Sequence, residues 1–571
     1  MAGKEIIELS YQLAELPSTQ HRAGLAGLVL MVQEIENQET LQYYESALLE
    51  LDNLDEFGVS VKFNLEGLKA LFDVTFGAFS EERWSTKKDK KKEYTENEIR
   101  QVEKKDKGGK IKTVTEYSYS VVIPHGAFLP YLDESGEDKN GIWIKLWRDM
   151  YWSIIRGRDT QRTSFKERCD KNQNLGKYIK DVKEQWNNFS SSNKVAKQSS
   201  TYFLGAESFN SENIPIKDTV SYQFLLNFAP FVFQVYRPTT LDKDGKRDFS
   251  KDALTYALAI PDIADLKRFC YFFPKLLKQR SNEKLGYSPK ESIIDLANES
   301  ALNFFILEDR IARDIGEQST KKSILGVEVI HVKPGQKLNF FGFNYLEPIT
   351  TQTDQYKQIK DSYWCPWFRK QRLTNLLNSI VYSDNQEGKD EEIPPWFGFD
   401  DLLSRIPRKW LETNKDYFSH DARILFNQEI LNKQGVTEMS KNNTKIRQYS
   451  EIVYRVCQSY VRGKLKVKYG LEWDKVKGNP KLEKDYSENK TKIANEAFLA
   501  VRSRTEKQAF IDYFVSTLYP FIKKEEFTQF AEDLFNKTDE IRALTLLALS
   551  SQFSSTKEDN KSNKNPESNV A

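Results

Sequence analysis

The spacing of apolar residues divides the chain into a first part of mixed strand and helix and a last part that is almost wholly helical. Apolar positions recur at helical spacing over Gln20–Glu36 and again over Glu66–Phe76. Between these helices, Val59, Val61 and Phe63 alternate with polar or small residues, as a half-buried strand does. From about residue 353 onward the pattern is helical almost throughout.

Strands and helices also alternate through the middle of the chain. The same periodicities predict strands over Tyr117–Ile123, Phe231–Tyr236, Leu254–Ile260, Ile324–Val332 and Leu338–Tyr345. They predict helices over Gly141–Gly157, Lys171–Phe189, Asp262–Gln279 and Pro289–Arg313. The segment between the strands at 231–236 and 254–260 is rich in turn residues, which favours antiparallel pairing of these two strands.

The pattern therefore predicts an α+β protein with a large mixed N-terminal body, residues 1–435, and a C-terminal all-helical bundle, residues 439–555. Residues 86–112 form a charge-dense insertion that cannot bury a core, so it should be a mobile loop or a long polar hairpin. The tail, residues 556–571, is rich in Ser, Asn and Lys and should be disordered.

The charge is distributed unevenly between these two parts. Residues 439–571 hold 24 Lys and Arg against 18 Asp and Glu, a net charge of +6 in a chain whose total is +2. Such asymmetry suggests that the helical bundle meets a polyanion. The alternative is an ordinary solvated helix surface.

One predicted helix, Lys441–Lys468, carries most of this charge. Ile446, Tyr449, Ile452, Val453, Val456 and Tyr460 recur at helical spacing and form a face that can pack. The candidate phosphate contacts on this helix are Lys445, Arg447, Arg455, Arg462, Lys464, Lys466 and Lys468. A second predicted helix, Lys490–Leu518, adds Arg502 and Arg504. Tyr449, Tyr460 and Tyr469 are the candidates for base stacking.

A second basic cluster follows the Trp-rich helix that is predicted at 141–157. Its candidate nucleic-acid contacts are Arg156, Arg158, Gln161, Arg162, Lys166 and Arg168. Arg and Gln side chains with loop amides suit both phosphate contacts and contacts to base edges. The alternative is a surface loop whose arginines pair with Asp159 and Glu167.

The sequence lacks the patterns of several catalytic classes. There is no Gly-x-x-x-x-Gly-Lys-Ser/Thr loop, no His-Glu-x-x-His and no Gly-x-Ser-x-Gly. Four cysteines and four histidines are scattered without metal-ligand spacing, which predicts a reducing, cytoplasmic compartment and no metal or other cofactor. No apolar run approaches the ~18 residues that span a membrane. We therefore expect a non-catalytic binding protein; the alternatives are a nucleic-acid-processing enzyme with a dispersed active site and a plain interaction scaffold.

Several short segments together resemble a known family. They are Leu16–Leu28, Leu146–Met150, Arg156–Arg158 with Arg162, Tyr202–Glu207, Phe228–Val232 and Val235–Pro238. These segments resemble the large subunit of type I CRISPR effector complexes (Cascade), in the Myxococcus-type lineage grouped with subtype I-B. The resemblance covers most of residues 10–440, and the charged insertion at 86–112 has no counterpart in it.

The resemblance implies a non-catalytic subunit that recognises the protospacer-adjacent motif on double-stranded DNA and stabilises the R-loop, while a crRNA reads the target by base pairing. Its expected partners are the crRNA, the target duplex, the Cascade backbone and handle-binding subunits, and a small subunit. A helicase-nuclease would indicate defence, and a transposition adaptor would indicate guided transposition. In some such systems the C-terminal part is also made separately as the small subunit, and Met439 stands where that internal start is needed.

Overall fold

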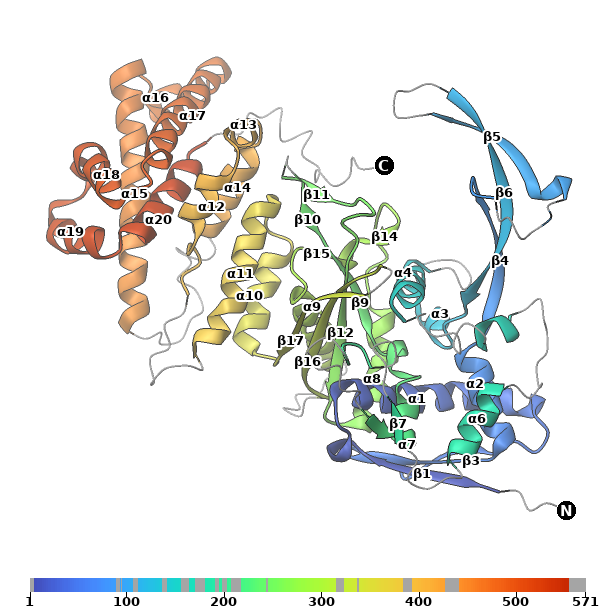
Figure 1. The fold of residues 1–571 in the computed structure, drawn as a ribbon. Helices are drawn as coiled ribbons and strands as arrows, with labels where there is room; N and C mark the ends of the chain where they lie inside the picture. The colour runs from blue at the N-terminus through green and yellow to red at the C-terminus, as the bar shows by residue number, and fades with distance from the viewer. Residues whose placement is uncertain are drawn as a thin grey trace. The chain divides into compact units, whose positions relative to one another are not determined.

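The fold is known from a computed structural model (Figure 1). For residues 441–448 it describes the backbone alone. The described residues are 5–88, 93, 95–105, 111–135, 141–155, 164–169, 180–189, 195–197, 203–206, 217–242, 245–314, 323–335, 338–383, 393–426 and 441–553. Met439 and residues 171–179 and 556–571 lie outside this set, so the predictions made for them are not addressed by the structure.

The chain folds into two compact units. The first combines Met1–Pro238 with Leu254–Pro348, and the second combines Thr239–Ala253 with Ile349–Ala571. All the larger sheets belong to the first unit, whereas the described part of the second unit is helical apart from one short hairpin. The predicted α+β class is confirmed. The predicted boundary at 435–439 lies outside the described residues and stays a prediction.

A five-stranded sheet forms the centre of the first unit, in the order β15-β9-β12-β16-β17. The strands are β9 (Gln234–Pro238), β12 (Tyr256–Ile263), β15 (Ile293–Ile294), β16 (Ile324–Lys333) and β17 (Asn339–Leu346). Only the β15–β9 pair is parallel. Every residue of β12 is buried, as its central place requires. The predicted pairing of β9 with β12 is confirmed.

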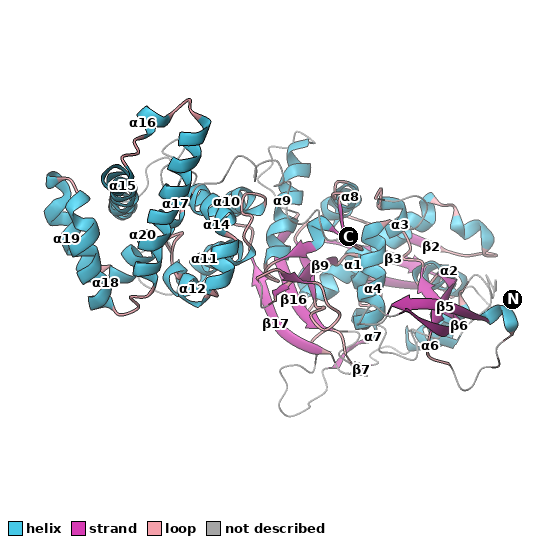
Figure 2. Cartoon of the chain, turned by 90° about the horizontal axis from the view of Figure 1, so that it is seen from above, coloured by secondary structure: helices cyan, strands magenta, loops and turns pink. Residues whose placement is uncertain are grey.

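Helix α1 (Thr19–Asn37) packs against this sheet, as Figure 2 shows. Ser18 caps its N-terminus by accepting the amide hydrogen of His21. A Cβ at Gly24 or Gly27 would lie only 2.4 or 2.3 Å from a main-chain oxygen of the segment 225–228. The small residues at the start of α1 thus permit close backbone packing, as the sequence predicted.

The charged insertion is a long hairpin in the residues described. Strands β5 (Ile99–Lys105) and β6 (Ile111–Pro124) pair over seven residues, and β4 (Ala78–Ser85) joins the other edge of β6. Glu116 holds the hairpin together, because its carboxylate, in a residue only 4% exposed, lies 2.8 Å from Arg100 and 2.6 Å from Lys104. Of the two predicted forms, the hairpin is the one observed.

Three further sheets and the remaining described helices complete the first unit. The order of the second sheet is β1-β3-β2, with β1 (Ile7–Gln12), β2 (Leu49–Asp52) and β3 (Gly58–Phe63). The short strands are β7 (Val195–Lys197) with β8 (Lys217–Thr219), and β13 (Lys284–Leu285) with β14 (Ser288–Pro289). The helices are α2 (Leu65–Thr75), α3 (Leu129–Leu132), α4 (Ile142–Met150), α6 (Lys180–Phe189), α7 (Val220–Leu225), α8 (Leu266–Lys278) and α9 (Glu299–Asp314).

Two predicted helices of this unit begin or end differently. The helix expected over 289–313 begins only at Glu299, because Ile293 and Ile294 form β15 against β9. β-Branched residues favour that extended state. The helix expected over 141–157 is α4 followed by a π-helical turn at Tyr151–Ile155, and residues 156–157 are not described.

Helix α20 (Thr538–Ser550) is the core of the second unit, with Ile541–Ser550 all buried. Helices α15 (Lys441–Tyr469), α17 (Pro480–Arg502), α12 (Phe399–Arg405) and α14 (Lys415–Ile424) pack around it, and α15 and α17 lie beside it in Figure 2. The other helices are α10 (Thr350–Lys360), α11 (Pro366–Ser383), α13 (Arg408–Thr413), α16 (Trp473–Val476), α18 (Lys507–Tyr513) and α19 (Phe527–Asn536).

The second unit also contains a hairpin from the middle of the chain, β10 (Thr240–Leu241) with β11 (Arg247–Asp248). Its Gly245 has φ +74°, and a Cβ there would lie 2.3 Å from the indole nitrogen of Trp367 and 2.6 Å from that of Trp410. Glycine is therefore required at this position for both conformation and space.

The predicted helix Lys490–Leu518 is two helices, because α17 ends at Arg502 and α18 begins at Lys507. The Ser503 hydroxyl donates to the carbonyl of Ala500, which a continuing helix would use for its own main chain. Such local side-chain bonds compete with helical ones.

Candidate nucleic-acid interface

Helix α15 presents one apolar face to the bundle, as its sequence predicted. Tyr449, Ile452, Val453 and Val456 are buried, whereas Tyr460 is half-buried. The Tyr449 hydroxyl donates to Glu540 of α20. Its ring is 1% exposed, so the proposed base stacking at Tyr449 is wrong. The side chain of Ile446 lies outside the described residues.

Three basic residues of α15 fall on the opposite side, and carboxylates pair with two of them. Arg455, Arg462 and Lys466 are separated by seven and four residues, so they share one helix face. Arg455 pairs with Glu526. The ammonium of Lys466 lies 3.2 Å from Glu472.

Two cations of α15 are left without such a partner. Among the described residues, no carboxylate lies within ion-pair distance of Arg462 or Lys464. The ammonium of Lys464 lies 5.8 Å from the ring centroid of Tyr460, and Lys468 lies 3.5 Å from Glu496. The side chains of Lys445 and Arg447 are not described. Among the cations of α15 whose side chains are described, Arg462 and Lys464 are thus the ones without an ion pair.

Arg502 and Arg504 have different surroundings. Arg502 donates to the main-chain oxygens of Leu403, at 2.9 Å, and Ser404, at 3.1 Å, which satisfies the C-terminal end of α12. Arg504 lies 4.5 Å above the ring of Tyr513. Most donors of Arg502 are therefore committed to the fold of the bundle.

Sequence reasoning missed a further cation of α17. Lys490 lies four residues after Tyr486 and three before Ile493, both buried, so it shares the packed face of α17. Burial, followed by the charges of Arg423 and Arg462, lowers the pKa of Lys490 to about 8. The signal in the sequence was a lysine at an apolar position of the helical repeat.

The cluster that follows the Trp-rich helix lies only partly within the described residues. Arg156, Arg158, Gln161 and Arg162 fall outside them. Lys166 is exposed. The Arg168 side chain is only 6% exposed, with its guanidinium 2.7 Å from Asp73 and 3.5 Å from Asp181. Arg168 thus takes part in a buried ion-pair network.

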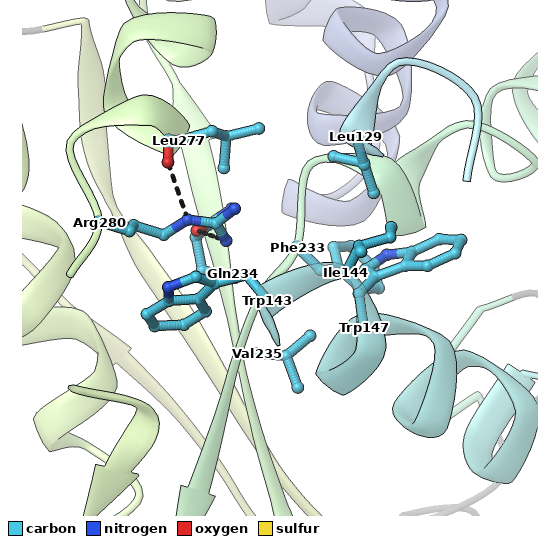
Figure 3. Close-up of a pocket in the computed structure, with 9 residues that line it drawn as sticks. All are labelled: Leu129, Trp143, Ile144, Trp147, Phe233, Gln234, Val235, Leu277 and Arg280. Atoms are coloured by element: carbon cyan, nitrogen blue, oxygen red, sulfur yellow. Dashed lines mark hydrogen bonds between the residues drawn. The ribbon is translucent and has the colours of Figure 1, made fainter. Parts of the chain in front are cut away.

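The Trp-rich helix itself lines a small pocket of the first unit, shown in Figure 3 with Trp143, Trp147 and Arg280. The Trp143 indole donates to the Ser281 carbonyl, and the Trp147 indole to that of Pro230. The Arg280 guanidinium lies 4.5 Å above Trp143, and burial lowers the pKa of Arg280 to about 10. Both tryptophans are therefore buried structural residues of the first unit.

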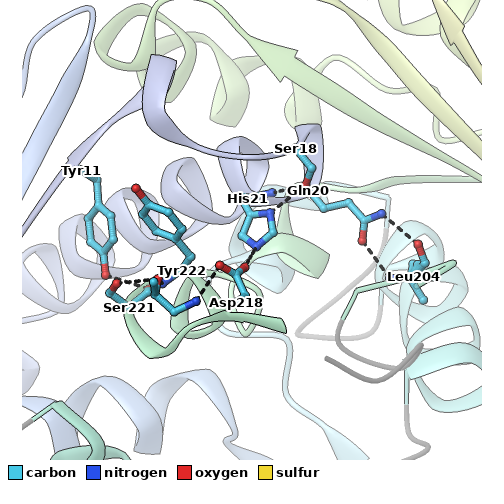
Figure 4. A network of polar contacts seen from close by, with 9 residues as sticks. Tyr11, Ser18, Gln20, His21, Leu204, Asp218, Ser221 and Tyr222 are labelled. Atoms are coloured by element: carbon cyan, nitrogen blue, oxygen red, sulfur yellow. Dashed lines mark hydrogen bonds and ion pairs between the residues drawn. The ribbon is translucent and has the colours of Figure 1, made fainter. Parts of the chain in front are cut away.

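A polar network ties α1 to the segment that contains β8 and α7 (Figure 4). The ring of His21 lies 2.7 Å from the Ser18 hydroxyl and 2.8 Å from Asp218, and the Gln20 amide makes two bonds to the main chain of Leu204. Ser, His and Asp are the residue types of a nucleophilic triad. Here Ser18 is the cap of α1 and His21 is 3% exposed, so the arrangement serves the fold.

The described part of the chain offers no group of three His, Cys, Asp or Glu residues that could hold a metal ion. None of its helices is long and apolar enough to cross a membrane.

Two family sequence models match the chain in succession. The one described as Type I-B CRISPR Cas8b N-terminal domain matches residues 48–317. The one described as Type I-B CRISPR Cas8b C-terminal domain matches residues 324–552. No curated protein matches the sequence.

Proposed function

Because this chain belongs to the Cas8b family of type I-B CRISPR large subunits, we propose that it recognises the protospacer-adjacent motif on double-stranded DNA and stabilises the R-loop. The crRNA would read the target by base pairing, so the protein would need only to read a short motif and hold the opened strands. The proposed partners are the crRNA, the target duplex, the Cascade backbone and handle-binding subunits, and a small subunit.

The pair Arg462 and Lys464 is the observation that carries the strand-holding part of this proposal. Both lie on the surface of α15 without a described carboxylate partner, whereas Arg455, Lys466 and Lys468 have one. A single strand is held mainly by cations along its backbone and by stacked rings. Arg462 and Lys464 are two residues apart and therefore point to different sides of α15. We assign the displaced strand to a path that crosses this helix and meets both cations, with the half-buried Tyr460 beside Lys464.

The test compares two double variants within the assembled effector complex. Arg462→Ala with Lys464→Ala removes the unpaired cations, and Lys466→Ala with Lys468→Ala removes two paired cations from the same helix. R-loop formation on a target duplex is measured by permanganate reactivity of the displaced strand. We expect a clear loss for the first double variant and a small change for the second. Equal effects would contradict the strand-holding role.

Motif recognition is assigned to the first unit, with Arg156, Arg158, Gln161, Arg162 and Lys166 as its candidate contacts. An arginine that reads a base edge contributes about 1–3 kcal/mol of discrimination, whereas a phosphate contact weakens binding to all sequences equally. The quadruple alanine variant separates base reading from phosphate contact when its binding is measured on duplexes with varied motifs. It replaces Arg156, Arg158, Gln161 and Arg162. Unchanged binding would remove this loop from the proposal.

The subunit is proposed to be non-catalytic and to act in the cytoplasm, in defence together with a helicase-nuclease or in guided transposition together with an adaptor. DNA cleavage that needs Mg²⁺ and is abolished by a point substitution in this chain would refute the non-catalytic role. Met439 is proposed as the internal start of a separate small subunit. Replacing its codon should remove a fragment of about 130 residues from the intact-mass spectrum of the complex, within the few-residue precision of such a boundary.

A further inference from the structure

The one-turn helix α16, which connects α15 to α17, begins with an exposed tryptophan, Trp473. Gly470 ends α15 with φ +65°, and the Asn479 side chain caps the start of α17, so both ends of the connection are fixed. Val476 is buried and anchors the turn in the bundle. α16 lies against α17, as Figure 2 shows. The tryptophan is therefore held on a defined part of the fold.

The indole of Trp473 is supported on one side and leaves much of its surface open. The residue is 46% exposed. Its ring meets that of the buried Tyr486 of α17, with the two centroids 5.3 Å apart. Another exposed tryptophan of this unit, Trp364, differs, because the His420 ring stacks flat on it at 3.4 Å between centroids. Trp473 thus offers an aromatic surface that no such stacked ring covers among the described residues.

The chain around Trp473 is strongly basic. Residues 464–484 hold seven lysines against three acids, and one of those acids, Glu472, pairs with two of the lysines. Lys477 and Lys481 are exposed and have no ion pair among the residues described. The Lys477 amide donates to the Trp473 carbonyl at 3.0 Å, so Lys477 follows the indole by one helical turn.

An aromatic ring among unpaired lysines fits a single-stranded nucleic acid better than a protein. Lysine is depleted from the cores of protein–protein interfaces, because burial of its ammonium removes hydration. A single strand provides a flat base for the ring and phosphates for the lysines, which stay hydrated. A duplex provides only the phosphates, because its bases are already stacked on one another.

We propose that Trp473 stacks on a base of the single strand that the helical unit holds, while Lys477 contacts an adjoining phosphate. This inference rests on the proposed strand-holding function and deepens it, because it adds a stacking ring to the cations of α15. Tyr486 is a positioning residue that supports the indole from α17. Every base has a flat face, so the contact is independent of the strand's sequence.

The test measures how the full-length chain binds two strands of equal length. One is oligothymidine, and the other is an abasic strand that has the same phosphates without bases. Trp473→Leu keeps an apolar side chain but removes the ring, Trp473→Phe keeps a ring, and Lys477→Met removes the cation. Val467→Ala is the matched control, because Val467 is 84% exposed in the same basic stretch and has no ring.

We expect Trp473→Leu to weaken oligothymidine binding by about 5-fold to 150-fold, which is the contribution of one stacked base. Its affinity for the abasic strand and its salt slope should stay unchanged, because no phosphate contact is lost. Each phosphate contact to a single strand contributes about 0.7 to the slope of log affinity against log salt, so Lys477→Met should lower that slope by about 0.7. Trp473→Phe should keep most of the oligothymidine affinity, and Val467→Ala all of it.

Three results would overturn the proposal. Wild-type affinity of Trp473→Leu for oligothymidine would show that no base stacks on the indole. Loss of that variant from the assembled effector complex, with its strand binding intact, would assign the ring to a protein subunit. An equal loss of affinity for both strands would mean that the substitution disturbs the surface and removes no base contact. Failure of the strand-holding function is seen separately, as intact R-loops in the double variant Arg462→Ala with Lys464→Ala.

Discussion

The two units differ in the partners that the structure gives to their arginine and lysine side chains. In the first unit two buried arginines are held by protein oxygens: Arg168 faces Asp73, and Arg148 donates to the main-chain oxygens of Pro124 and His125. In the helical unit Arg462, Lys464 and Lys490 have no carboxylate within ion-pair distance among the residues described. Both units are rich in lysine and arginine, and the helical unit leaves these three, on two neighbouring helices, without an ion pair among the residues described.

Pairing, more than the density of charge in the sequence, is therefore our basis for proposing where a polyanion binds. Glu116 neutralises Arg100 and Lys104 in the charged hairpin, although that hairpin has one of the highest densities of lysine in the chain. Conversely, Lys490 is one of many lysines in the charge count, but burial and then the charges of Arg423 and Arg462 lower its pKa to about 8.

The largest effect is expected when the buried ion pair of Arg168 with Asp73 in the first unit is broken. Arg168→Met leaves Asp73 buried beside the Tyr44 hydroxyl without its cation. Breaking a buried pair in this way costs about 3–5 kcal/mol of the free energy of unfolding. Chemical denaturation measures the loss. Arg83→Met is the control, because its pair with Glu81 is exposed and should contribute about 1 kcal/mol at most.

Adding Asp73→Asn to Arg168→Met should recover part of that loss, because the remaining carboxylate is then neutral. If Arg168→Met lowered the free energy of unfolding no more than Arg83→Met does, burial would not strengthen the Arg168–Asp73 pair. That result would contradict the contrast between the two units.

A second prediction concerns an acid of the first unit that is not neutralised. Burial, followed by the charge of Asp262, raises the pKa of Glu328 to about 7. The native state then binds more protons than the unfolded state between pH 4.5 and about 7, so stability should fall as the pH rises through this range. The fall is bounded at about 3 kcal/mol. Denaturation at several pH values should show it in the wild type and lose it in Glu328→Gln.

Lys490 should give the opposite trend in the helical unit. Its native pKa of about 8 lies below the ordinary lysine value of 10.5, so the unfolded state binds more protons between these pH values. The stability of the chain in phosphate-free buffer should therefore rise with pH from about 8 to 10.5, by up to about 3 kcal/mol. Lys490→Met should remove the rise, whereas Lys492→Met should keep it. A rise of equal size in both variants would assign it to other groups.

The smallest effect is expected from a substitution that removes ion pairs from two lysines. Glu472 lies 3.2 Å from Lys466 and 2.6 Å from Lys475, so Glu472→Gln releases two cations near the C-terminal end of α15. Binding of oligothymidine should become tighter, with a salt slope steeper by up to about 1.4 if both lysines contact phosphates. Stability should change by no more than about 1 kcal/mol. Glu525→Gln, an exposed acid with no described ion pair, controls for net charge. An equal gain in oligothymidine affinity in both variants would show that the affinity depends on net charge alone.

Much of the fold could be predicted from local patterns, because these follow from one element at a time. The small residues of α1, the alternation in β3 and the pairing of β9 with β12 were predicted correctly. The start of α9 was misplaced because pairing of β15 with β9, more than 50 residues earlier in the chain, decides that segment. Tertiary pairing of this kind overrides local propensity.

The candidate interface was less predictable for the same reason. Arg502 and Arg462 look alike in the sequence, but Arg502 donates to carbonyls nearly 100 residues away and Arg462 does not. The exception is Lys490, whose place in the apolar repeat of α17 is visible in the sequence alone. Its neighbours Arg423 and Arg462 come from two other helices, so only the packing of the bundle brings them to it.

The hairpin β10–β11 has a consequence for the order in which the protein is made. Gly245 reaches the ribosome exit more than 100 residues before Trp367 and Trp410, against which it packs. The hairpin is therefore synthesised long before the helices that carry these tryptophans. Until those helices have been made and folded, the hairpin lacks its packing partners. A polypeptide begun at Met439 would be made without it, and without either tryptophan, so any such product would have to reach its fold by a different route from the full chain.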